Sequence, residues 1–391
     1  MPDRLRCYRC DRTYDRTAQR CDCGEPLWFD VSGPAADAGA AGIWRFGGLL
    51  PVDDPGGLAS AAGDTPLIRA DRLDDYAGCR VHVKDEGEHP TGSFKDRGTA
   101  VGVADALDRD RTAVGTVSHG NMAMSVAAYA AAANLDCVVL VPADIPPERL
   151  GIIAQYDPHV LRIDGDYGRL YEESLAVGTA TGVTFLNSDS PLRVAGQKTT
   201  TLEILSAFRP EAPDAIVVPV SSGGHASGAW KAVRDLAARD ALPSTPKLCF
   251  VQSAACDPIA AAFRAGDDRV SPTTPGDTIA YSIANPDPPS GTRALTAARA
   301  TGGAVVSVDD DEIRDARVRL ARDAGLCVET ASATSLAGAR RLAADGVLVP
   351  DDRVVLVATG SGFKEASAAV TDIDAPTVTL AAVQDAVETL L

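Results

Sequence analysis

The chain has 391 residues, of which 45% are hydrophobic, and its formal net charge is −17. This length is enough for two or three domains with full cores, while no apolar run approaches the roughly 18 residues of a membrane span. We therefore expect no membrane partner. Nucleic acid is also excluded as an expected partner, because such an acidic surface repels phosphate backbones.

The N-terminus lacks a charged segment followed by an apolar one, so we expect no secretion signal and a cytoplasmic protein. Few lysines combined with many acidic residues are typical of a cytosolic protein from a high-salt, halophilic cell. An ordinary acidic bacterial enzyme is the alternative.

The first thirty residues contain four closely spaced cysteines, namely Cys7, Cys10, Cys21 and Cys23. Four sulfurs at this spacing, across a short basic hairpin, suit tetrahedral zinc. Two disulfides are the alternative, although no secretion signal indicates an oxidising compartment. Four cysteine ligands would close the zinc shell, so the ribbon is predicted to be structural rather than catalytic.

Beyond a linker at 31–42, rich in Gly, Ala, Pro and Asp, apolar runs alternate with helical patterns. Strands are predicted at 65–68, 81–83, 114–117, 137–141, 160–163, 183–186, 215–218, 248–251 and 354–357. Helices are predicted at 122–133, 147–156, 167–181, 227–240, 312–324 and 333–344. This alternation predicts parallel sheets covered by helices, which is an α/β fold.

Two α/β units facing each other would form a cleft between them. We expect a zinc ribbon at 1–30, a linker and the first part of a large domain at 31–94, a small α/β domain at 95–189, and the remainder of the large domain at 190–391.

The segment Pro90–Arg97 places a lysine directly after a Gly/Ser turn, in a chain that otherwise prefers arginine. An amine can form a Schiff base with an aldehyde cofactor, whereas a guanidinium cannot. Lys95 is therefore the candidate covalent residue. The alternative is a helix N-terminus capped by Ser93, with a solvated lysine.

Three further segments follow predicted strands, where ligands bind in open α/β sheets. These segments are Ser118–Asn121, Ser221–Gly228 and Thr359–Lys364. The second has a Gly/Ser turn leading into a helix, which forms an anion cradle, but it lacks the spacing of P-loops and dinucleotide sites. A helix cap or a simple βα turn is the alternative for the other two.

A fourth segment, Leu192–Thr199, contains Arg193. The planar guanidinium of arginine can bind a phosphate group through two parallel hydrogen bonds. An ordinary surface arginine is the alternative.

Together these segments resemble the fold-type II pyridoxal-phosphate enzymes, and among them the threonine synthases of the archaeal and bacterial type with an N-terminal four-cysteine zinc ribbon. The resemblance covers nearly the whole chain, and the motifs stand in the family's order. It implies two parallel-sheet α/β domains with the active site in their cleft. It also implies pyridoxal 5′-phosphate as the cofactor and structural zinc in the ribbon.

The resemblance assigns Lys95 to the covalent bond with the cofactor and to proton transfer, and Asn121 to the cofactor's 3′-oxygen. Thr359 would bond the pyridine nitrogen. The loop that holds the 5′-phosphate would comprise Ser222, Gly223, Gly224, His225 and Ala226. As a base, Lys95 needs a pKa well below the roughly 10.4 of free lysine, through desolvation and the nearby cofactor charge.

The implied reaction converts O-phospho-L-homoserine and water into L-threonine and phosphate by γ-elimination and β-replacement. Arg193 would bind the substrate phosphate, and Ser118 is a second substrate-binding candidate. His119 and Met122 depart from the family's pattern and leave the substrate-side contacts open. Homodimers are usual in this family.

Two alternatives remain at this point. One is another enzyme of the same fold, such as a cysteate synthase or a threonine dehydratase. The other is an inactive binding protein that uses its zinc ribbon to recruit partners.

Overall fold

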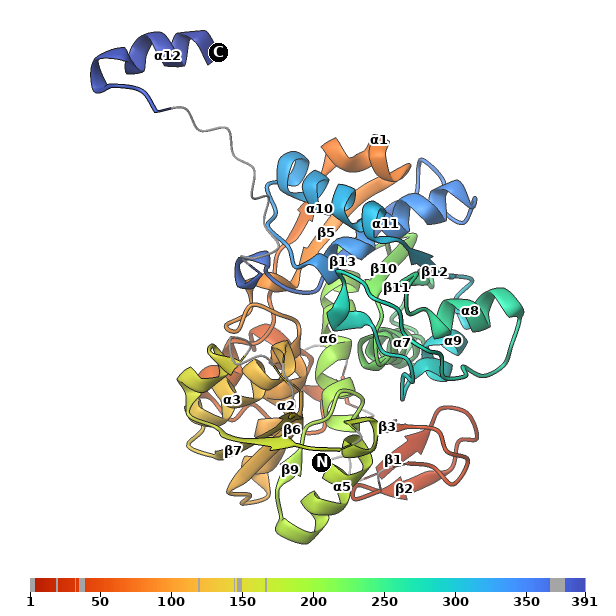
Figure 1. Cartoon of the computed structure of the whole chain (residues 1–391). Helices are drawn as coiled ribbons and strands as arrows, with labels where there is room; N and C mark the ends of the chain where they lie inside the picture. Colours follow the sequence, from red (N-terminus) through yellow and green to blue (C-terminus); the bar gives the residue numbers. More distant parts are fainter. Residues whose placement is uncertain are drawn as a thin grey trace.

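The computed structural model describes residues 4–18, 20–31, 33–34, 39–118, 120–143, 145, 150–165, 167–365 and 377–390. Within these residues the strands form three sheets, and the fold is α/β as predicted (Figure 1). The N-terminal sheet is antiparallel, in the order β2-β1-β3. It contains β1 (Arg4–Cys7), β2 (Thr13–Asp15) and β3 (Leu27–Phe29).

The largest sheet has six strands in the order β12-β11-β10-β13-β5-β4. Its neighbours are parallel, except that β4 runs antiparallel to β5 at one edge. The strands are β4 (Leu67–Arg69), β5 (Arg80–Asp85), β10 (Ala215–Pro219), β11 (Lys247–Ser253), β12 (Val305–Val308) and β13 (Arg353–Ala358).

The third sheet is parallel throughout, in the order β8-β7-β6-β9. It contains β6 (Ala113–Val117), β7 (Asp136–Pro142), β8 (His159–Ile163) and β9 (Thr184–Phe185). The helix predicted at 147–156 differs from the structure: residues 147–149 lie outside the described part, and Ile153–Tyr156 forms a 3-10 turn, η5.

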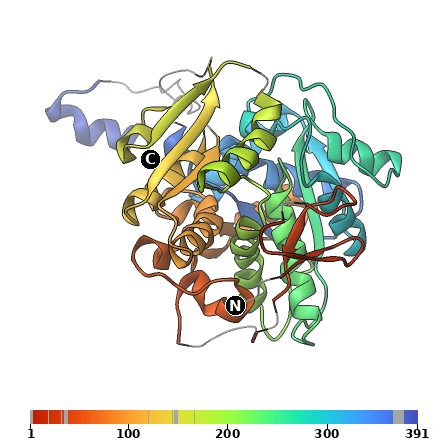
Figure 2. The ribbon, with the colours of Figure 1, turned by 90° about the horizontal axis from the view of Figure 1, so that it is seen from below.

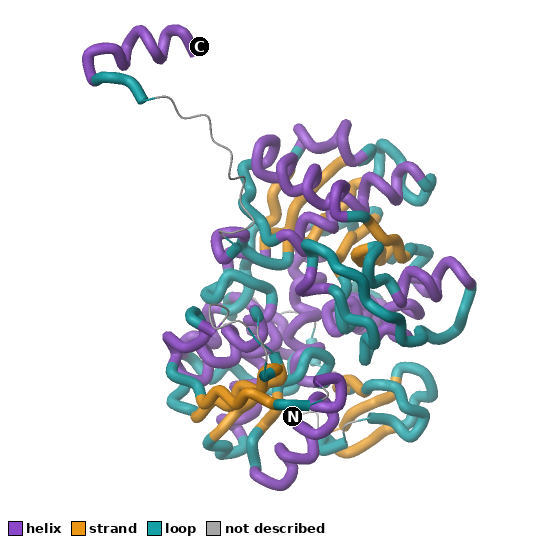
Figure 3. Tube along the Cα trace, viewed as in Figure 1, coloured by secondary structure: helices purple, strands orange, loops and turns teal. Residues whose placement is uncertain are grey.

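Helices cover the six-stranded and the four-stranded sheet (Figure 3). They are α1 (Asp74–Ala77), α2 (Lys95–Asp108), α3 (Asn121–Ala132), α5 (Tyr167–Thr181), α6 (Pro191–Ala207), α7 (Gly224–Ala237), α8 (Pro258–Ala265), α9 (Gly291–Ala300), α10 (Asp310–Ala324), α11 (Thr330–Ala344) and α12 (Val383–Leu390). Further 3-10 turns are η1 (Gly42–Leu49), η2 (Gly57–Ala61), η3 (Asp71–Leu73), η4 (Glu86–Glu88), η6 (Tyr281–Ile283), η7 (Gly362–Lys364) and η9 (Leu380–Ala382). No helix in the described part is long and apolar enough to cross a membrane.

The central strands of the six-stranded sheet, β10, β11 and β13, are apolar on both faces, because helices cover each face. Val217 and Leu356 pack in one core with residues of α10 and α11. Their neighbours Ile216 and Val355 point to the opposite face and pack in another core with residues of α7, α8 and α9. This burial on both sides explains the continuous hydrophobic runs in the sequence.

Helix α6 lies between α2 and α7, and it is almost entirely buried. Gly196 permits this contact, because a Cβ there would clash with the Arg97 carbonyl oxygen of α2. On the other side, a Cβ at Gly228 of α7 would lie 2.8 Å from the Lys198 nitrogen. These close approaches bring the N-terminal halves of α2, α6 and α7 together, and three of the predicted motifs lie there.

Candidate active site

Lys95 is the first residue of α2, and the loop before it is attached to the turn that follows β13. The Phe94 N–H donates to the Thr359 carbonyl at 3.1 Å, and the Ser361 N–H donates to the Gly92 carbonyl at 2.9 Å. Gly92 has a φ of +72°, which glycine adopts without strain. The lysine loop and the turn after β13 therefore form one unit, although more than 260 residues separate them in the sequence.

The surroundings of Lys95 leave much of its amine uncharged near neutral pH. Burial lowers its pKa to about 7; the Arg193 guanidinium acts in the same direction and the Glu329 carboxylate opposes it. Among the described residues its Nζ has no hydrogen-bond acceptor, and it lies 4.3 Å from the centroid of the Phe94 ring. An uncharged, unengaged amine is the nucleophilic form.

A buried ionic network holds the first turn of α2 in place. Arg97 donates to Glu86 at 2.6 and 2.8 Å and to Glu203 at 2.7 and 2.8 Å. Lys84 donates to Glu203 at 2.7 Å. Burial alone would raise the pKa of Glu203, but Arg97 and Lys84 outweigh it and hold that pKa at about 2. The lysine loop is thus anchored by a buried cluster in which the positive and negative charges compensate each other.

Asn121 is the first residue of α3, and its side chain bonds Glu329 and Lys364, which belong to the part of the chain around the six-stranded sheet. Its Nδ2 donates to both carboxylate oxygens of Glu329 at 2.8 Å. Lys364 donates to Asn121 Oδ1 at 2.7 Å and to the Gly92 carbonyl at 2.7 Å, and it pairs with Glu329 at 3.1 Å. An ammonium group can only donate, so the amide oxygen must face Lys364 and the NH₂ must face away from it.

Ser118 lies at the carboxyl end of β6, where its Oγ accepts from the Gly120 N–H at 3.3 Å. No hydrogen bond joins Ser118 to the other predicted site residues that the structure describes. Of the two departures from the family pattern, His119 lies outside the described residues and Met122 is buried in the core.

The predicted anion loop follows β10, and α7 begins within it, at Gly224. The ring of His225 stacks on the Phe94 ring, with the centroids 4.2 Å apart, and its Nε2 lies 3.2 Å from Thr200 Oγ1. Burial lowers the pKa of His225 to about 3, so the ring is neutral. The anion loop therefore contacts the lysine loop through the stacked rings of His225 and Phe94.

Thr359 follows β13, and its hydroxyl lies 2.9 Å from the hydroxyl of Ser332 on α11. Both residues are buried. Ser332 also accepts from the Gly360 N–H at 3.0 Å, so this pair fixes the turn in which Thr359 stands.

Arg193, on the first turn of α6, has no exposed surface, which rules out the surface-arginine alternative. It donates to the Thr99 hydroxyl at 2.9 Å and to the Lys95 carbonyl at 3.3 Å. Burial lowers its pKa to about 10, while the Asp96 carboxylate opposes this. Neither hydrogen-bond acceptor carries a charge.

Several buried polar atoms of these segments have no hydrogen-bond partner among the described residues. They are Ser93 Oγ, Arg193 Nε, Gln197 Oε1 and His225 Nδ1. Buried polar groups are nearly always paired in native proteins, so such a concentration next to Lys95 needs an explanation. A bound polar group in this region supplies one, and the phosphate oxygens of pyridoxal phosphate fit the donors Ser93 Oγ and Arg193 Nε.

The ribbon cysteines also converge. Their sulfurs lie within 4.8 Å of one another, with separations that include 3.4 Å for Cys10–Cys21 and 3.7 Å for Cys7–Cys23, and all four thiols are free. A tetrahedral site with Zn–S bonds of about 2.3 Å requires sulfurs about 3.8 Å apart. The donor set and its size therefore fit zinc.

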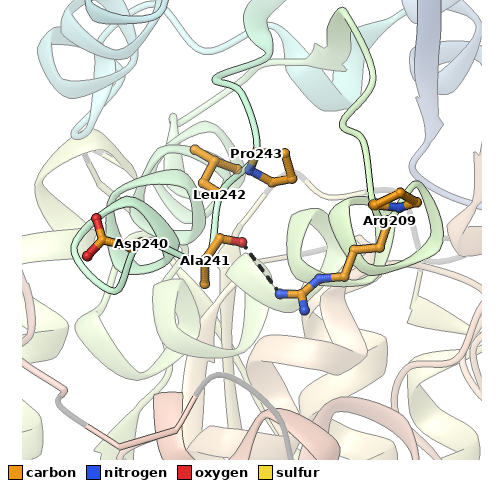
Figure 4. A pocket seen from close by; sticks show the side chains of 6 residues that line it. Arg209, Asp240, Ala241, Leu242 and Pro243 are labelled. Carbon is orange, nitrogen blue, oxygen red and sulfur yellow. Dashed lines mark hydrogen bonds between the residues drawn. The ribbon is translucent and has the colours of Figure 1, made fainter.

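A separate surface pocket lies between the ends of α6 and α7 (Figure 4). Its lining includes Arg209, whose guanidinium donates to the Ala241 carbonyl at 3.5 Å, together with Asp240, Leu242 and Pro243. None of the predicted site residues lines it, so it is not the candidate active site.

Comparison with known proteins bears on the identity of this site. Residues 58–360 match the family model "Pyridoxal-phosphate dependent enzyme". Over 387 residues the chain is 34% identical to a threonine synthase of Methanocaldococcus jannaschii, covering 95% of each chain. It is 35% identical over 389 residues to a threonine synthase of Methanosarcina acetivorans, covering 96% of this chain and 95% of that one. The chain belongs to the threonine synthase family of pyridoxal-phosphate-dependent enzymes.

Solved structures outside the threonine synthase family share the fold. The structure of maize serine racemase has a TM-score of 0.63 at 23% identity and covers 83% of this chain and 92% of its own. The processed form of threonine deaminase isoform 2 from Solanum lycopersicum has a TM-score of 0.64 at 20% identity and covers 85% and 89%. The fold-type II architecture is therefore confirmed.

In this threonine synthase family member, the sequence analysis gave no role to three polar residues, of which one ends a motif segment and two lie outside the motifs. These are Glu329, Ser332 and Lys364, which contact Asn121 or Thr359 in the structure. The scarcity of lysine could have singled out Lys364. Nothing in the local pattern indicated Ser332.

Proposed function

We propose that this chain is a threonine synthase, which converts O-phospho-L-homoserine and water into L-threonine and inorganic phosphate. The observation that carries the proposal is the fully buried Arg193, which within the described residues is paired only with neutral acceptors and lies against the backbone of Lys95. A substrate phosphate would give this cation a charged, bidentate acceptor. A dehydratase substrate has no phosphate and would leave it without a charged hydrogen-bond acceptor. Since Arg193 has no exposed surface, the residues covering it must move to admit the substrate.

Each assigned residue has a task that its surroundings support. Lys95, with its lowered pKa, serves as the covalent attachment residue and then as the base that moves a proton at the substrate's α- and β-carbons. Arg193 holds the phosphate that leaves the γ-carbon, and Ser118 is a substrate contact at the carboxyl end of β6. When bound, pyridoxal phosphate supplies an electron sink for the negative charge that develops on the substrate.

The cofactor itself would be held from three sides. Asn121 would donate from Nδ2 to its 3′-oxygen, and Thr359 would bond its pyridine nitrogen through a neutral hydroxyl. The residues Ser222, Gly223, Gly224, His225 and Ala226 would hold its 5′-phosphate at the start of α7, where backbone N–H groups and the helix dipole favour an anion.

Replacing Lys364 by methionine is expected to weaken cofactor binding by about 10-fold, because it removes the donor that orients the Asn121 amide. It also leaves the buried Glu329 carboxylate, whose pKa burial already raises, without its cation. Titration of the apo-protein with pyridoxal phosphate, followed by absorbance, measures this. Lys247→Met is the matched control, because Lys247 bonds the Val347 carbonyl far from the motifs. Equal affinities in the two variants would contradict the role of Lys364.

We propose that the ribbon binds one zinc ion through Cys7, Cys10, Cys21 and Cys23. Metal analysis of purified protein should give about one zinc per chain, and Cys10→Ser should lower both the zinc content and the thermal stability. Cys256→Ser, which changes a buried cysteine outside the ribbon, is the control. Metal-free wild-type protein with unchanged stability would refute the zinc assignment.

Four further inferences remain proposals. The chain would divide at residues 30, 94 and 189 into the ribbon, the small domain and the two parts of the large domain. It would form a homodimer, reside in the cytoplasm, and owe its acidic composition to a high-salt cell.

A substrate screen tests the proposed function. Purified, cofactor-loaded protein should release phosphate from O-phosphohomoserine much faster than from O-phosphoserine, and it should release little ammonia from threonine. Dominant ammonia release from threonine would favour a threonine dehydratase, and dominant turnover of O-phosphoserine a cysteate synthase. A loaded protein that turns over none of them would favour the inactive binding protein.

A further inference from the structure

Arg293 on α9 is a fully buried arginine that no predicted motif contains. On one side its Nε donates to Ser227 Oγ at 2.8 Å, and its second guanidinium nitrogen donates to Ser290 Oγ at 3.1 Å. On the other side it donates to the carbonyls of Pro26 at 3.4 Å and Leu27 at 3.3 Å, where β3 of the ribbon begins. One guanidinium thus connects the ribbon to α7.

The bonds on the α7 side lead directly into the anion loop. Ser227 Oγ donates to the Gly223 carbonyl at 2.6 Å, and the Ser290 N–H donates to the Ser222 carbonyl at 2.9 Å. A Cβ at Gly223 would lie 2.6 Å from the Ser290 carbonyl oxygen, so the two segments are in tight contact. Arg293 therefore holds the two serines that bond the carbonyls of Ser222 and Gly223, the first two residues of the loop. It also places a positive charge close to the loop.

Aromatic residues of the ribbon also hold the Arg293 guanidinium in place. Arg293 lies over the rings of Trp28 and Tyr8, at 5.4 and 5.9 Å from their centroids. Both rings contact Trp230 of α7, at 5.5 and 5.6 Å. In Figures 1 and 2 the ribbon lies beside this part of the large sheet's helical layer. Without the ribbon, Arg293 would lose two carbonyl acceptors and two aromatic rings.

An arginine of the ribbon itself reaches the same region. Arg20 pairs with the buried Asp189 at 3.3 Å, and Asp189 also accepts from Ser290 Oγ at 3.4 Å and from the Tyr171 hydroxyl. The Asp189 charge partly compensates the buried Arg293 guanidinium. Both connections from the ribbon therefore converge on Ser290, which backs the anion loop.

We propose that the four-cysteine ribbon braces the anion-binding loop, with Arg293 as the positioning residue that joins them, so that the ribbon contributes to binding the cofactor's phosphate group. This inference rests on the proposed assignment of residues 222–226 to that phosphate. It gives the ribbon a role at the active site, although the ribbon contributes no residue to the reaction.

The test compares two aldehydes that differ only in the phosphate, using full-length apo-protein. Affinities for pyridoxal 5′-phosphate and for pyridoxal are measured by absorbance titration, and their ratio reports the phosphate contribution. Ser227→Ala removes the link between Arg293 and Gly223 with a minimal change in volume. Arg293→Lys retains the charge but loses the planar fork. Trp28→Leu acts from the ribbon side and leaves Arg293 itself unchanged.

Each variant is expected to lower the affinity ratio by about 10- to 100-fold while its pyridoxal affinity changes little, since charge-assisted hydrogen bonds are the strong ones. Arg299→Met, on the same helix but partly exposed, should keep the wild-type ratio. If a variant bound both aldehydes more weakly by the same factor, as a general loss of stability would cause, the proposal would be overturned. An unchanged affinity ratio in folded Ser227→Ala would overturn it as well. A wild type that does not prefer the phosphorylated aldehyde would instead refute the loop assignment itself.

Discussion

Arg193→Ala is expected to lower kcat/KM for O-phosphohomoserine by about 30- to 1000-fold. A lost bidentate, charge-assisted contact with phosphate is worth about 2–4 kcal/mol in an enclosed site. Arg193→Lys should fall between the wild type and the alanine variant, because it keeps a charge but cannot form the planar fork. Initial rates of phosphate release over a range of substrate concentrations measure both effects.

Two controls separate this role from a structural one. The visible absorbance of the bound cofactor should be unchanged in Arg193→Lys, because this arginine is assigned to the substrate. Arg314→Ala, which removes an exposed arginine on α10 paired with Asp311, should retain full activity. If Arg193→Ala folds and releases phosphate at the wild-type rate, the substrate assignment is refuted.

Lys95→Ala is expected to lower turnover by at least about 10⁴-fold, because it removes both the covalent attachment and the proton-transfer base. The variant should lose the absorbance band of lysine-bound cofactor, although the cofactor can still bind through residues 222–226. Reduction with borohydride followed by peptide mapping checks the attachment. A fully active variant with the cofactor reduced onto another lysine would overturn the assignment.

The pH dependence of cofactor capture tests the environment of Lys95. Only the uncharged amine attacks the aldehyde, and burial lowers its pKa to about 7. The rate at which apo-protein captures pyridoxal phosphate should therefore rise as the pH increases to about 7 and level off above it. An amine with the ordinary pKa of about 10.4 would give a rate that keeps rising up to pH 10. Stopped-flow absorbance distinguishes the two profiles.

The sequence predicted the α/β fold well because its signals are local. Apolar runs such as Ala215–Pro219 are continuous, since helices cover both faces of the sheet. The motif segments at Asn121 and Thr359 follow strands, so their position at the carboxyl edge of a sheet could be expected from the sequence alone. The reversal of β4 could not be predicted, because its three residues carry no signal of direction.

The partners within the site could not be predicted, because they come from distant parts of the chain. Asn121 bonds Glu329 and Lys364, which lie more than 200 residues further on. The burial of Arg193 depends on how closely α6 approaches α2, which a single helix pattern does not reveal. The packing of the ribbon against Trp230 could likewise not be predicted, because the sequence of the ribbon indicated only a metal site.

The most direct test of the proposed function is to identify the products formed from O-phosphohomoserine. Proton and phosphorus NMR of a reaction with cofactor-loaded protein should show L-threonine and inorganic phosphate appearing in equal amounts, with water added at the β-carbon. If phosphate is instead accompanied by 2-oxobutanoate and ammonia, or if no phosphate is released, the chain is not a threonine synthase.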